Sequence, residues 1–200
     1  MKPWMIALTT AAALAACSPP ADAPETPEPV TPAVATAETA TPELTGFTHA
    51  AGEDLFGYYI PTQEVRIGDL KLDHLHIGGE TEFQAWARGE RSETYAPVML
   101  EFSDLSSPTV TNELGQVVHT KTVRVLPSAY KLGQGDFRFV GSHPEIGDVR
   151  IDGTIDLEQL NAQRLDANVA AEEAQPVLRA AAQIGPEQLK TLSFYWFGGD

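Results

Sequence analysis

The segment TKTVRVLPSAYKLGQGDFRFV, residues 120–140, decides the fold. Before Pro127 its apolar and polar residues alternate, which is the period of a half-buried β-strand. Beyond Pro127, Ser128–Leu132 and Asp136–Val140 form two further runs joined by Gly133–Gly135. Two short runs joined by a glycine-containing connection predict a β-hairpin.

The same period of two continues on both sides of this segment. Short alternating or apolar runs recur, separated by Gly, Pro, Asp and Ser, and no helical pattern interrupts them before residue 157. A pattern of about eight or nine short strands predicts an antiparallel β-sandwich or barrel-like domain. We expect the run 193–197 to be the last strand and to close the sheet. The other runs are 55–60, 64–67, 70–74, 81–87, 97–102, 149–151 and 154–157.

The composition changes near the C-terminus. Residues 157–184 are rich in Ala, Leu, Gln and Glu, and their apolar spacing predicts a helix that begins at Leu157. A second helix is expected from Pro176 to Ile184, and a one-turn helix at 186–192. The predicted fold is therefore mainly β, with a C-terminal helical segment around 157–192.

The first 16 residues have the layout of a secretory signal peptide. One positive charge, Lys2, precedes an apolar run that is too short to span a bilayer as a mature helix. The run ends in Leu14-Ala15-Ala16-Cys17, which resembles the lipobox of bacterial lipoproteins. The resemblance implies that diacylglycerol alkylates Cys17, which becomes the first residue of the mature protein. In that family a serine at the next position, here Ser18, goes with export to the outer membrane.

Residues 17–46 are expected to form a disordered tether behind this cysteine. Seven of the 15 prolines fall between Ser18 and Gly46, together with five acidic residues and no Lys or Arg. No window there offers an apolar face, and proline removes backbone donors, so neither helix nor sheet is expected. Residues 47–200 then form a single globular domain.

The net charge of the chain excludes some classes of binding partner. There are 28 acidic and 13 basic residues, a formal net charge of −15. Such a charge opposes binding to nucleic acid and to anionic lipid, so the acyl group on Cys17 must supply the membrane affinity. Cys17 is the only cysteine, so no intramolecular disulfide is expected.

The polar motif Asp73-His74-Leu75-His76 is a candidate metal site. On a strand His74 and His76 point to the same face, a spacing that brings two imidazoles to one zinc or copper ion. The alternative is structural: Leu72 has the same parity, so the histidines would continue its face. A third ligand would come from Asp73, His119, His143 or an acidic residue elsewhere in the chain.

Catalytic motifs are weak. No Gly-x-Ser-x-Gly elbow occurs, and no glycine-rich phosphate loop precedes a helix. His143-Pro144-Glu145 is better explained as a turn than as an acid–base pair, and a polar loop contains Asp104, Ser106, Ser107 and Asn112. Eight aromatic residues are either core or the lining of a pocket for an apolar or glycan ligand: Phe56, Tyr58, Tyr59, Phe83, Trp86, Tyr130, Phe137 and Phe139.

These patterns favour an exported lipoprotein, anchored through Cys17 on the periplasmic face of the outer membrane. Its expected role is non-catalytic binding, assembly or accessory work with an envelope protein or glycan, without a cofactor. The alternative is a periplasmic metal-handling protein that uses His74 and His76. A third possibility is an enzyme whose catalytic residues come together only in the folded chain.

Overall fold

The computed structural model describes residues 43–165 and 175–199, which lie within one compact unit, Thr41–Asp200. The predicted signal peptide, Cys17 and most of the predicted tether lie outside the described residues. Within the two described ranges no helix is long and apolar enough to cross a membrane. The helices are α1 (Glu80–Ala87) and α2 (Leu157–Leu165), and the strands are β1 (Phe47–His49), β2 (Gly57–Pro61), β3 (Arg66–Ile67), β4 (Leu70–Ile77), β5 (Val98–Asp104), β6 (Thr109–Thr111), β7 (Val117–His119), β8 (Thr122–Val125), β9 (Pro127–Gly133), β10 (Asp136–His143), β11 (Gly147–Ile155), β12 (Leu178–Ile184) and β13 (Glu187–Phe197).

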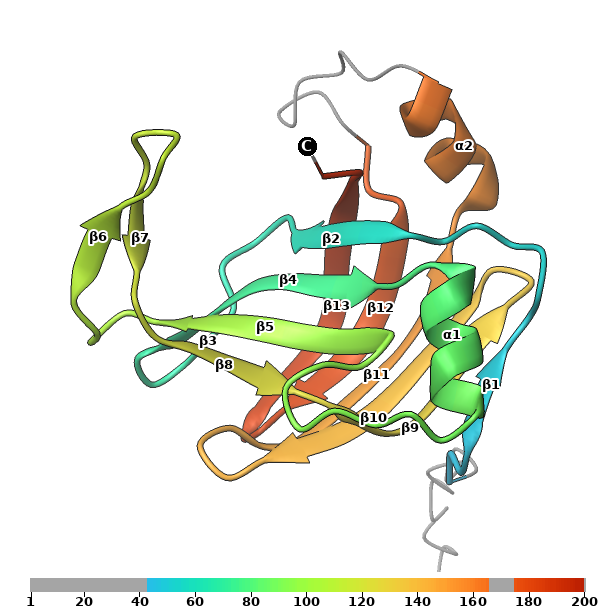
Figure 1. Cartoon of the computed structure of the whole chain (residues 1–200), viewed down its shortest axis with the longest axis horizontal. Coiled ribbons are helices and arrows are strands. Elements are labelled where there is room, and N and C mark those ends of the chain that lie inside the picture. The colour runs from blue at the N-terminus through green and yellow to red at the C-terminus, as the bar shows by residue number, and fades with distance from the viewer. Residues whose placement is uncertain (1–42, 166–174, 200) are drawn as a thin grey trace, which may run out of the picture. The chain divides into compact units, whose positions relative to one another are not determined.

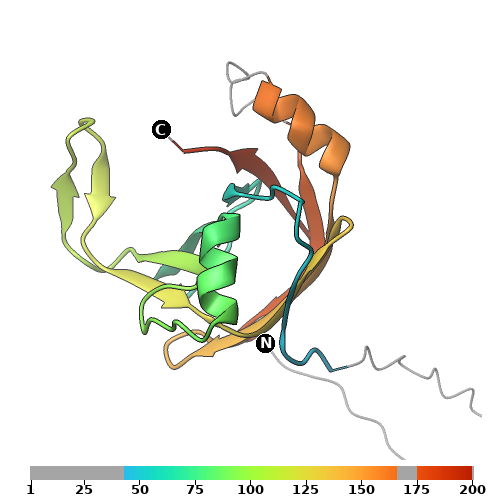
Figure 2. The same ribbon diagram turned by 45° about the vertical axis from the view of Figure 1, so that its right-hand side comes forward.

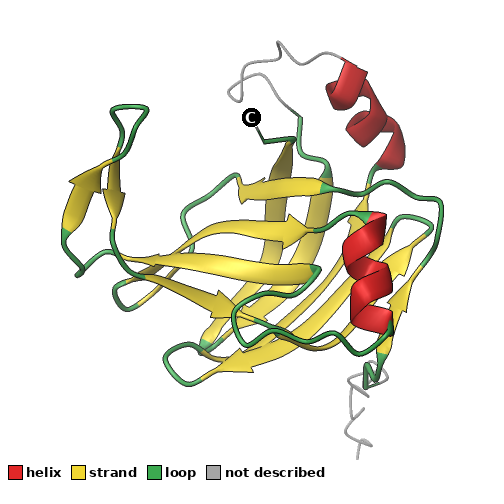
Figure 3. Cartoon of the chain, viewed as in Figure 1, coloured by secondary structure: helices red, strands yellow, loops and turns green. Residues whose placement is uncertain are grey.

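The main sheet curls into a barrel (Figures 1 and 3). Its strand order is β1-β9-β10-β11-β12-β13-β2-β4-β5-β8, with β3 paired to β4. Only Leu126 separates β8 from β9, so the two sides of the sheet meet where the chain turns at Pro127. All neighbours are antiparallel except β1, which runs parallel to β9. The predicted mainly β, barrel-like fold is confirmed, and β13 closes the sheet against β2 as expected.

The hairpin of β9 and β10 forms where the sequence predicts it. Leu132 pairs with Phe137 and Tyr130 with Phe139, so the apolar residues of both strands face the interior together. The connection needs a left-handed backbone, with φ of +57° at Gln134 and +79° at Gly135. Glycine adopts that conformation without steric cost, which explains its place in the turn.

Large side chains fill the inside of the barrel. Tyr59, Phe102, Phe137, Phe139 and Phe194 are all under 2% exposed. Burial of each such ring contributes roughly 1.5–3 kcal/mol, so this core provides much of the folding free energy. Tyr59, Phe137 and Phe139 are therefore core residues, the first of the two alternatives that the sequence leaves open.

Residues 81–87 form most of helix α1, and the prediction of a strand there is wrong. The helix starts because the carboxylate of Glu82 returns to the backbone N of Gly79, at 2.6 Å. A side chain at Gly78 would leave no room for this contact, since its Cβ would lie 2.5 Å from Glu82 Oε2. Phe83 and Trp86, three residues apart, then share the buried face of the helix.

The C-terminal segment holds one helix followed by two strands. Helix α2 ends at Leu165, whereas 178–184 is strand β12 and 187–197 is strand β13. The predictions of helices at 176–184 and 186–192 are wrong. In β12 Leu178, Ala180, Ala182 and Ile184 are buried and the residues between them are exposed. Pairing with β11 and β13 on both sides outweighs the helix propensity of Ala, Leu and Gln.

Candidate functional site

Strand β4 holds His74 and His76 on the outside of the barrel. Its register with β5 shifts between Leu72 and His74, which inserts an extra residue and reverses the alternation beyond that point. Leu75 and Ile77, both 0% exposed, therefore take the interior positions. The two histidines share a face as predicted, but the prediction that this is the face of Leu72 is wrong.

His76 belongs to a chain of hydrogen bonds that ends on α1. The hydroxyl of Tyr95 donates to Glu82 Oε1, while Glu82 Oε2 accepts from Gly79. The phenol has one proton, so His76 Nε2, 2.9 Å from the Tyr95 oxygen, must be the donor of that bond. Nδ1 of the neutral ring then holds a lone pair, and it is buried with no partner among the described residues.

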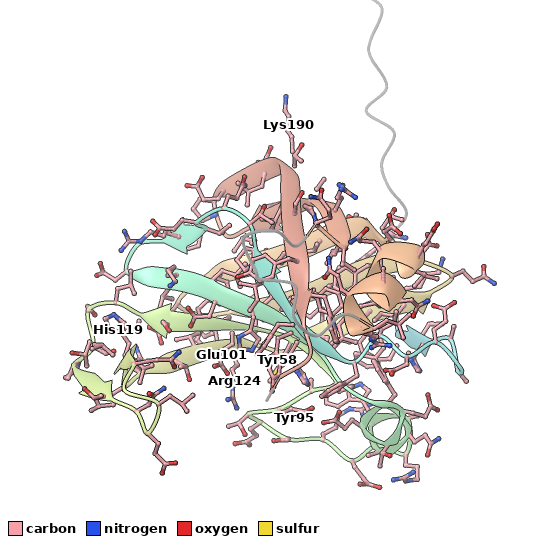
Figure 4. The ribbon with its side chains drawn as sticks, turned by 90° about the horizontal axis from the view of Figure 1, so that it is seen from above. Tyr58, Tyr95, Glu101, His119, Arg124 and Lys190 are labelled. Carbon is pink, nitrogen blue, oxygen red and sulfur yellow. The ribbon has the colours of Figure 1, made fainter. Side chains whose placement is uncertain are left out.

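A charged row lies beside this chain on the outer face. His74 is opposite Glu101, which is opposite Arg124, and Arg124 Nε donates to Glu101 Oε2 at 2.6 Å. Tyr58 covers the row, with its ring centroid 5.0 Å from His74 and 5.3 Å from His76. Figure 4 shows Tyr58, Glu101 and Arg124 grouped together, with Tyr95 on the segment that crosses the outside of the barrel.

Burial sets the protonation of this cluster. It lowers the pKa of both His74 and His76 below the ordinary value, and the carboxylates of Glu101 and Glu82 only partly oppose this. Burial, followed by the hydrogen bond to Glu82, raises the pKa of Tyr95. The cluster is therefore arranged for neutral histidines and a protonated phenol at neutral pH.

The proposed third metal ligands lie elsewhere. His119 is on the β6–β7 hairpin, away from Tyr58 and Tyr95 (Figure 4), and donates from Nδ1 to the backbone of Ser107 at 3.2 Å. Asp73 accepts from Ser103, and His143 accepts from the backbone of Glu145 at 3.2 Å. Within residues 43–165 and 175–199 no three His, Cys, Asp or Glu side chains are placed to hold one metal ion.

A cavity of about 390 Å³ lies between α1, β1 and β9. In Figure 2 helix α1 lies in front of the ring of strands, beside the segment that contains β1. The cavity is lined by the rings of Phe47, Phe83, Trp86 and Tyr130. Phe47 lies 5.5 Å from Trp86 and 5.2 Å from Tyr130 between ring centroids. Three of the eight predicted pocket aromatics, Phe83, Trp86 and Tyr130, thus meet in one cavity.

Polar groups occupy two places in this cavity. The guanidinium carbon of Arg91 lies 3.9 Å from the centroid of Trp86, and its Nη1 donates to the Trp86 carbonyl. His49 stacks on Phe83 at 3.8 Å, with Nδ1 3.7 Å from a carboxylate oxygen of Glu80. Burial lowers the pKa of His49, although Glu80 opposes the shift, so the neutral ring is favoured.

The other polar candidates are explained by turns. Asp104 Oδ1 accepts from the backbone N of Ser106 at 2.9 Å and from its hydroxyl at 2.6 Å, an arrangement typical of an Asx turn. In the 143–145 motif the carboxylate of Glu145 pairs with Lys121 at 3.0 Å. Both Glu145 and Lys121 line a second cavity of about 520 Å³ that also contacts Arg124.

Sequence reasoning missed Phe47, His49 and Arg91. Phe47 and His49 lie on a strand of three residues, too short to show a period. Arg91 lies in a polar segment where charged residues are expected on the surface. The one signal was Trp86 nearby, since large aromatic rings in exposed segments often accompany ligand sites.

Comparison of the chain with protein-family profiles, with curated proteins and with solved structures gives no match. Functional inference therefore depends on the geometry described above.

Proposed function

We propose that this protein is a lipid-anchored cell-envelope module that binds a small ligand in the cavity between α1, β1 and β9. The observation that carries the binding role is this cavity of about 390 Å³ with four aromatic rings in its lining. Small-molecule sites are concave, mainly apolar or aromatic, and contain a few placed polar groups. Arg91, His49, Glu80 and Gln84 are the polar side chains here.

The anchor rests on the resemblance of residues 14–17 to a lipobox. Each buried methylene contributes about 0.8 kcal/mol, so two or more acyl chains on Cys17 hold a protein stably in a membrane. The tether then ends at Gly46, and Phe47, the next residue, is already a wall of the cavity. The placement suits a protein that stays at the outer membrane and samples the periplasm for an envelope-derived ligand.

The cavity chemistry favours binding over catalysis. Among the described residues that line it there is no Ser, Thr or Cys to act as a nucleophile. The two residues there suited to acid–base work, His49 and Glu80, face each other, and His49 is also stacked on Phe83. Aromatic walls with one cation and one carboxylate suit recognition of an organic molecule, including a glycan fragment.

Mass spectrometry of the full chain isolated from its native membrane tests the anchor. We expect acyl mass on Cys17, and we expect a Cys17→Ser variant to lose both the acyl mass and membrane association. An unmodified thiol in membrane-bound protein would refute the anchoring half of the proposal.

The binding half is tested with two phenylalanines of similar exposure, Phe47 (41%) and Phe197 (46%). The full chain is purified from native membranes, and co-purifying small molecules are identified by native mass spectrometry. We expect Phe47→Ala to lose the bound molecule and Phe197→Ala, which lies outside the cavity, to retain it. Wild-type protein that never carries a ligand, or equal retention by both variants, would contradict this role.

A second candidate function is metal handling through His74 and His76. Its support is the buried Nδ1 lone pair of His76, which lacks a partner among the described residues. Zinc and copper both accept neutral imidazole nitrogen. Elemental analysis of tag-free protein, beside the His74→Ala/His76→Ala double variant, tests it: metal in wild type that disappears in the variant supports the idea, and metal in neither ends it.

A further inference from the structure

Arg91 lies in an acid-rich domain, yet it has no carboxylate partner among the residues that the structure describes. Residues 47–200 contain 23 acidic and 12 basic residues, so a basic side chain has many possible partners. Across residues 43–165 and 175–199, nine of the 12 Lys and Arg side chains form salt bridges, whereas Arg91, Arg179 and Lys190 do not. Arg88, the neighbour of Arg91, by contrast pairs with Glu90 at 2.9 Å.

The fold nevertheless holds the guanidinium of Arg91 in one place. Its carbon lies 3.9 Å from the Trp86 centroid and 5.3 Å from that of Phe47, and Nη1 donates to the Trp86 carbonyl. The segment that carries it is fixed further on, since Arg124 donates to the carbonyl of Thr94 at 3.1 Å. Stacking orients the planar group and leaves most of its N–H donors available for a second planar acceptor.

The guanidinium of Arg91 presents its N–H donors as a planar fork. The space next to this fork is suited to an apolar group. Arg91 is itself part of the cavity wall, so the volume of about 390 Å³ remains free while its side chain is in place. Phe47, Phe83 and Tyr130 provide the aromatic surfaces beside it. The positive charge of Arg91 also reaches Tyr130, where it partly opposes the effect of burial, which raises the pKa of the phenol to about 12.

We infer that the cavity binds a monocarboxylate with an aromatic or apolar body, with its carboxylate on the Arg91 fork and its body against Phe47 and Tyr130. This inference rests on the proposed binding function and names its ligand class. The fork geometry matches a carboxylate through two parallel N–H···O bonds.

The surrounding charge selects a single negative charge. The domain is strongly acidic, and Glu80 lies on the same cavity as Arg91. Each additional negative charge on a ligand is repelled by Glu80 and by the acidic domain, and one arginine, Arg91, compensates for this repulsion. A carboxylate monoanion therefore fits better than a phosphate dianion.

Three probes of one shape test the inference by calorimetry on the full chain in detergent: phenylacetate, its neutral amide phenylacetamide, and the cation phenethylammonium. We expect phenylacetate to bind at least about tenfold more tightly than the other two, because only it forms the charged bidentate pair. Equal or tighter binding of the cation or the amide overturns the inference but leaves the binding function intact. Binding of none of the three overturns the inference as well, and the co-purification test above then decides the binding function separately.

Charge-changing variants provide a second test of the inferred carboxylate site. Arg91→Gln should weaken phenylacetate binding about tenfold or more, and Arg91→Lys should have a smaller effect because an ammonium makes no fork. Arg88→Gln makes the same charge change outside the cavity and should alter affinity less than about twofold. Glu80→Gln should strengthen binding by about two- to threefold, since it removes the opposing charge. Equal losses in Arg91→Gln and Arg88→Gln would show a general charge effect and overturn the site.

Discussion

The two polar groupings that involve α1 differ in whether the protein satisfies them. On the outer face, the Glu82 carboxylate accepts from Gly79 and Tyr95, and Tyr95 in turn accepts from His76. In the cavity, the partners of Arg91 among the described residues are the Trp86 carbonyl and two ring faces. Glu82 and Tyr95 thus have their partners within the fold, although His76 Nδ1 has none among the described residues, and these bonds stabilise the protein. Arg91, a held cation with N–H donors to spare, is instead suited to a ligand.

Glu82→Ala should have the largest effect on stability. It removes the acceptor for both Gly79 N and Tyr95 OH, so we expect the free energy of unfolding to fall by about 2–4 kcal/mol. Urea denaturation followed by circular dichroism measures this. Glu80→Ala is the control, because this exposed acid in the same first turn accepts a hydrogen bond from Gln84 (3.0 Å) and lies 3.7 Å from His49, contacts whose loss should cost under about 1 kcal/mol. Equal losses would mean that the outer network is not a stabilising element.

Tyr95→Phe should have the next largest effect. It leaves the fold of the segment in place but removes the partner of His76 Nε2, a buried donor, at a cost of about 1–3 kcal/mol. Tyr195→Phe is the matched control, since the structure gives that hydroxyl no hydrogen bond within the described residues. We expect nuclear magnetic resonance of the imidazole of His76 to show the loss of its Nε2 hydrogen bond only in the Tyr95 variant.

A smaller effect is expected from pH. Burial lowers the pKa of His76, and nearby Glu82, Glu101, His74 and Arg124 do not reverse this. The unfolded chain therefore takes up a proton near the ordinary pKa of 6.5, while the folded chain resists it. Stability should be fullest above about pH 6.5 and fall as the pH drops below it. A His76→Gln variant should show a flatter fall between about pH 7 and pH 5, and an unchanged slope would contradict this origin.

Arg91→Gln should have the smallest effect on stability, under about 1 kcal/mol, because an exposed cation–π contact contributes little. Thermal unfolding of this variant beside Arg88→Gln measures it. Arg91 should contribute much to the affinity for phenylacetate and little to the free energy of unfolding. Glu82 should contribute much to the free energy of unfolding and little to that affinity. A loss of several kcal/mol on changing Arg91 would make it a structural residue.

The local sequence pattern was sufficient to predict secondary structure where one face of a strand is buried and turn residues mark its ends. The β9–β10 hairpin follows from alternation and from glycine in the turn. It failed at α1, where a capping contact between residues three apart decides, and at β12, where chain-distant strands decide. Residues 81–87 became helix through the contact of Glu82 with Gly79, and Ala-rich 178–184 became a strand between β11 and β13.

The candidate site shows the same division. The shared face of His74 and His76 follows from a period of two, but the register shift that places them outside is visible only in the pairing of β4 with β5. Phe83, Trp86 and Tyr130 were foreseeable as pocket aromatics. Their meeting with Phe47 and Arg91 was not, because α1, β1 and β9 are far apart in the chain.

The sequence by itself determined the mainly β class, the closing strand, the acidic charge and the expectation of a lipid on Cys17, because each depends on composition, on period or on a short contiguous motif. Only the tertiary structure decided which polar groups are satisfied. Whether Glu82 meets Tyr95, or Arg91 lies on Trp86 without a carboxylate, depends on how the barrel closes and where α1 packs on it, and no local pattern encodes those distances.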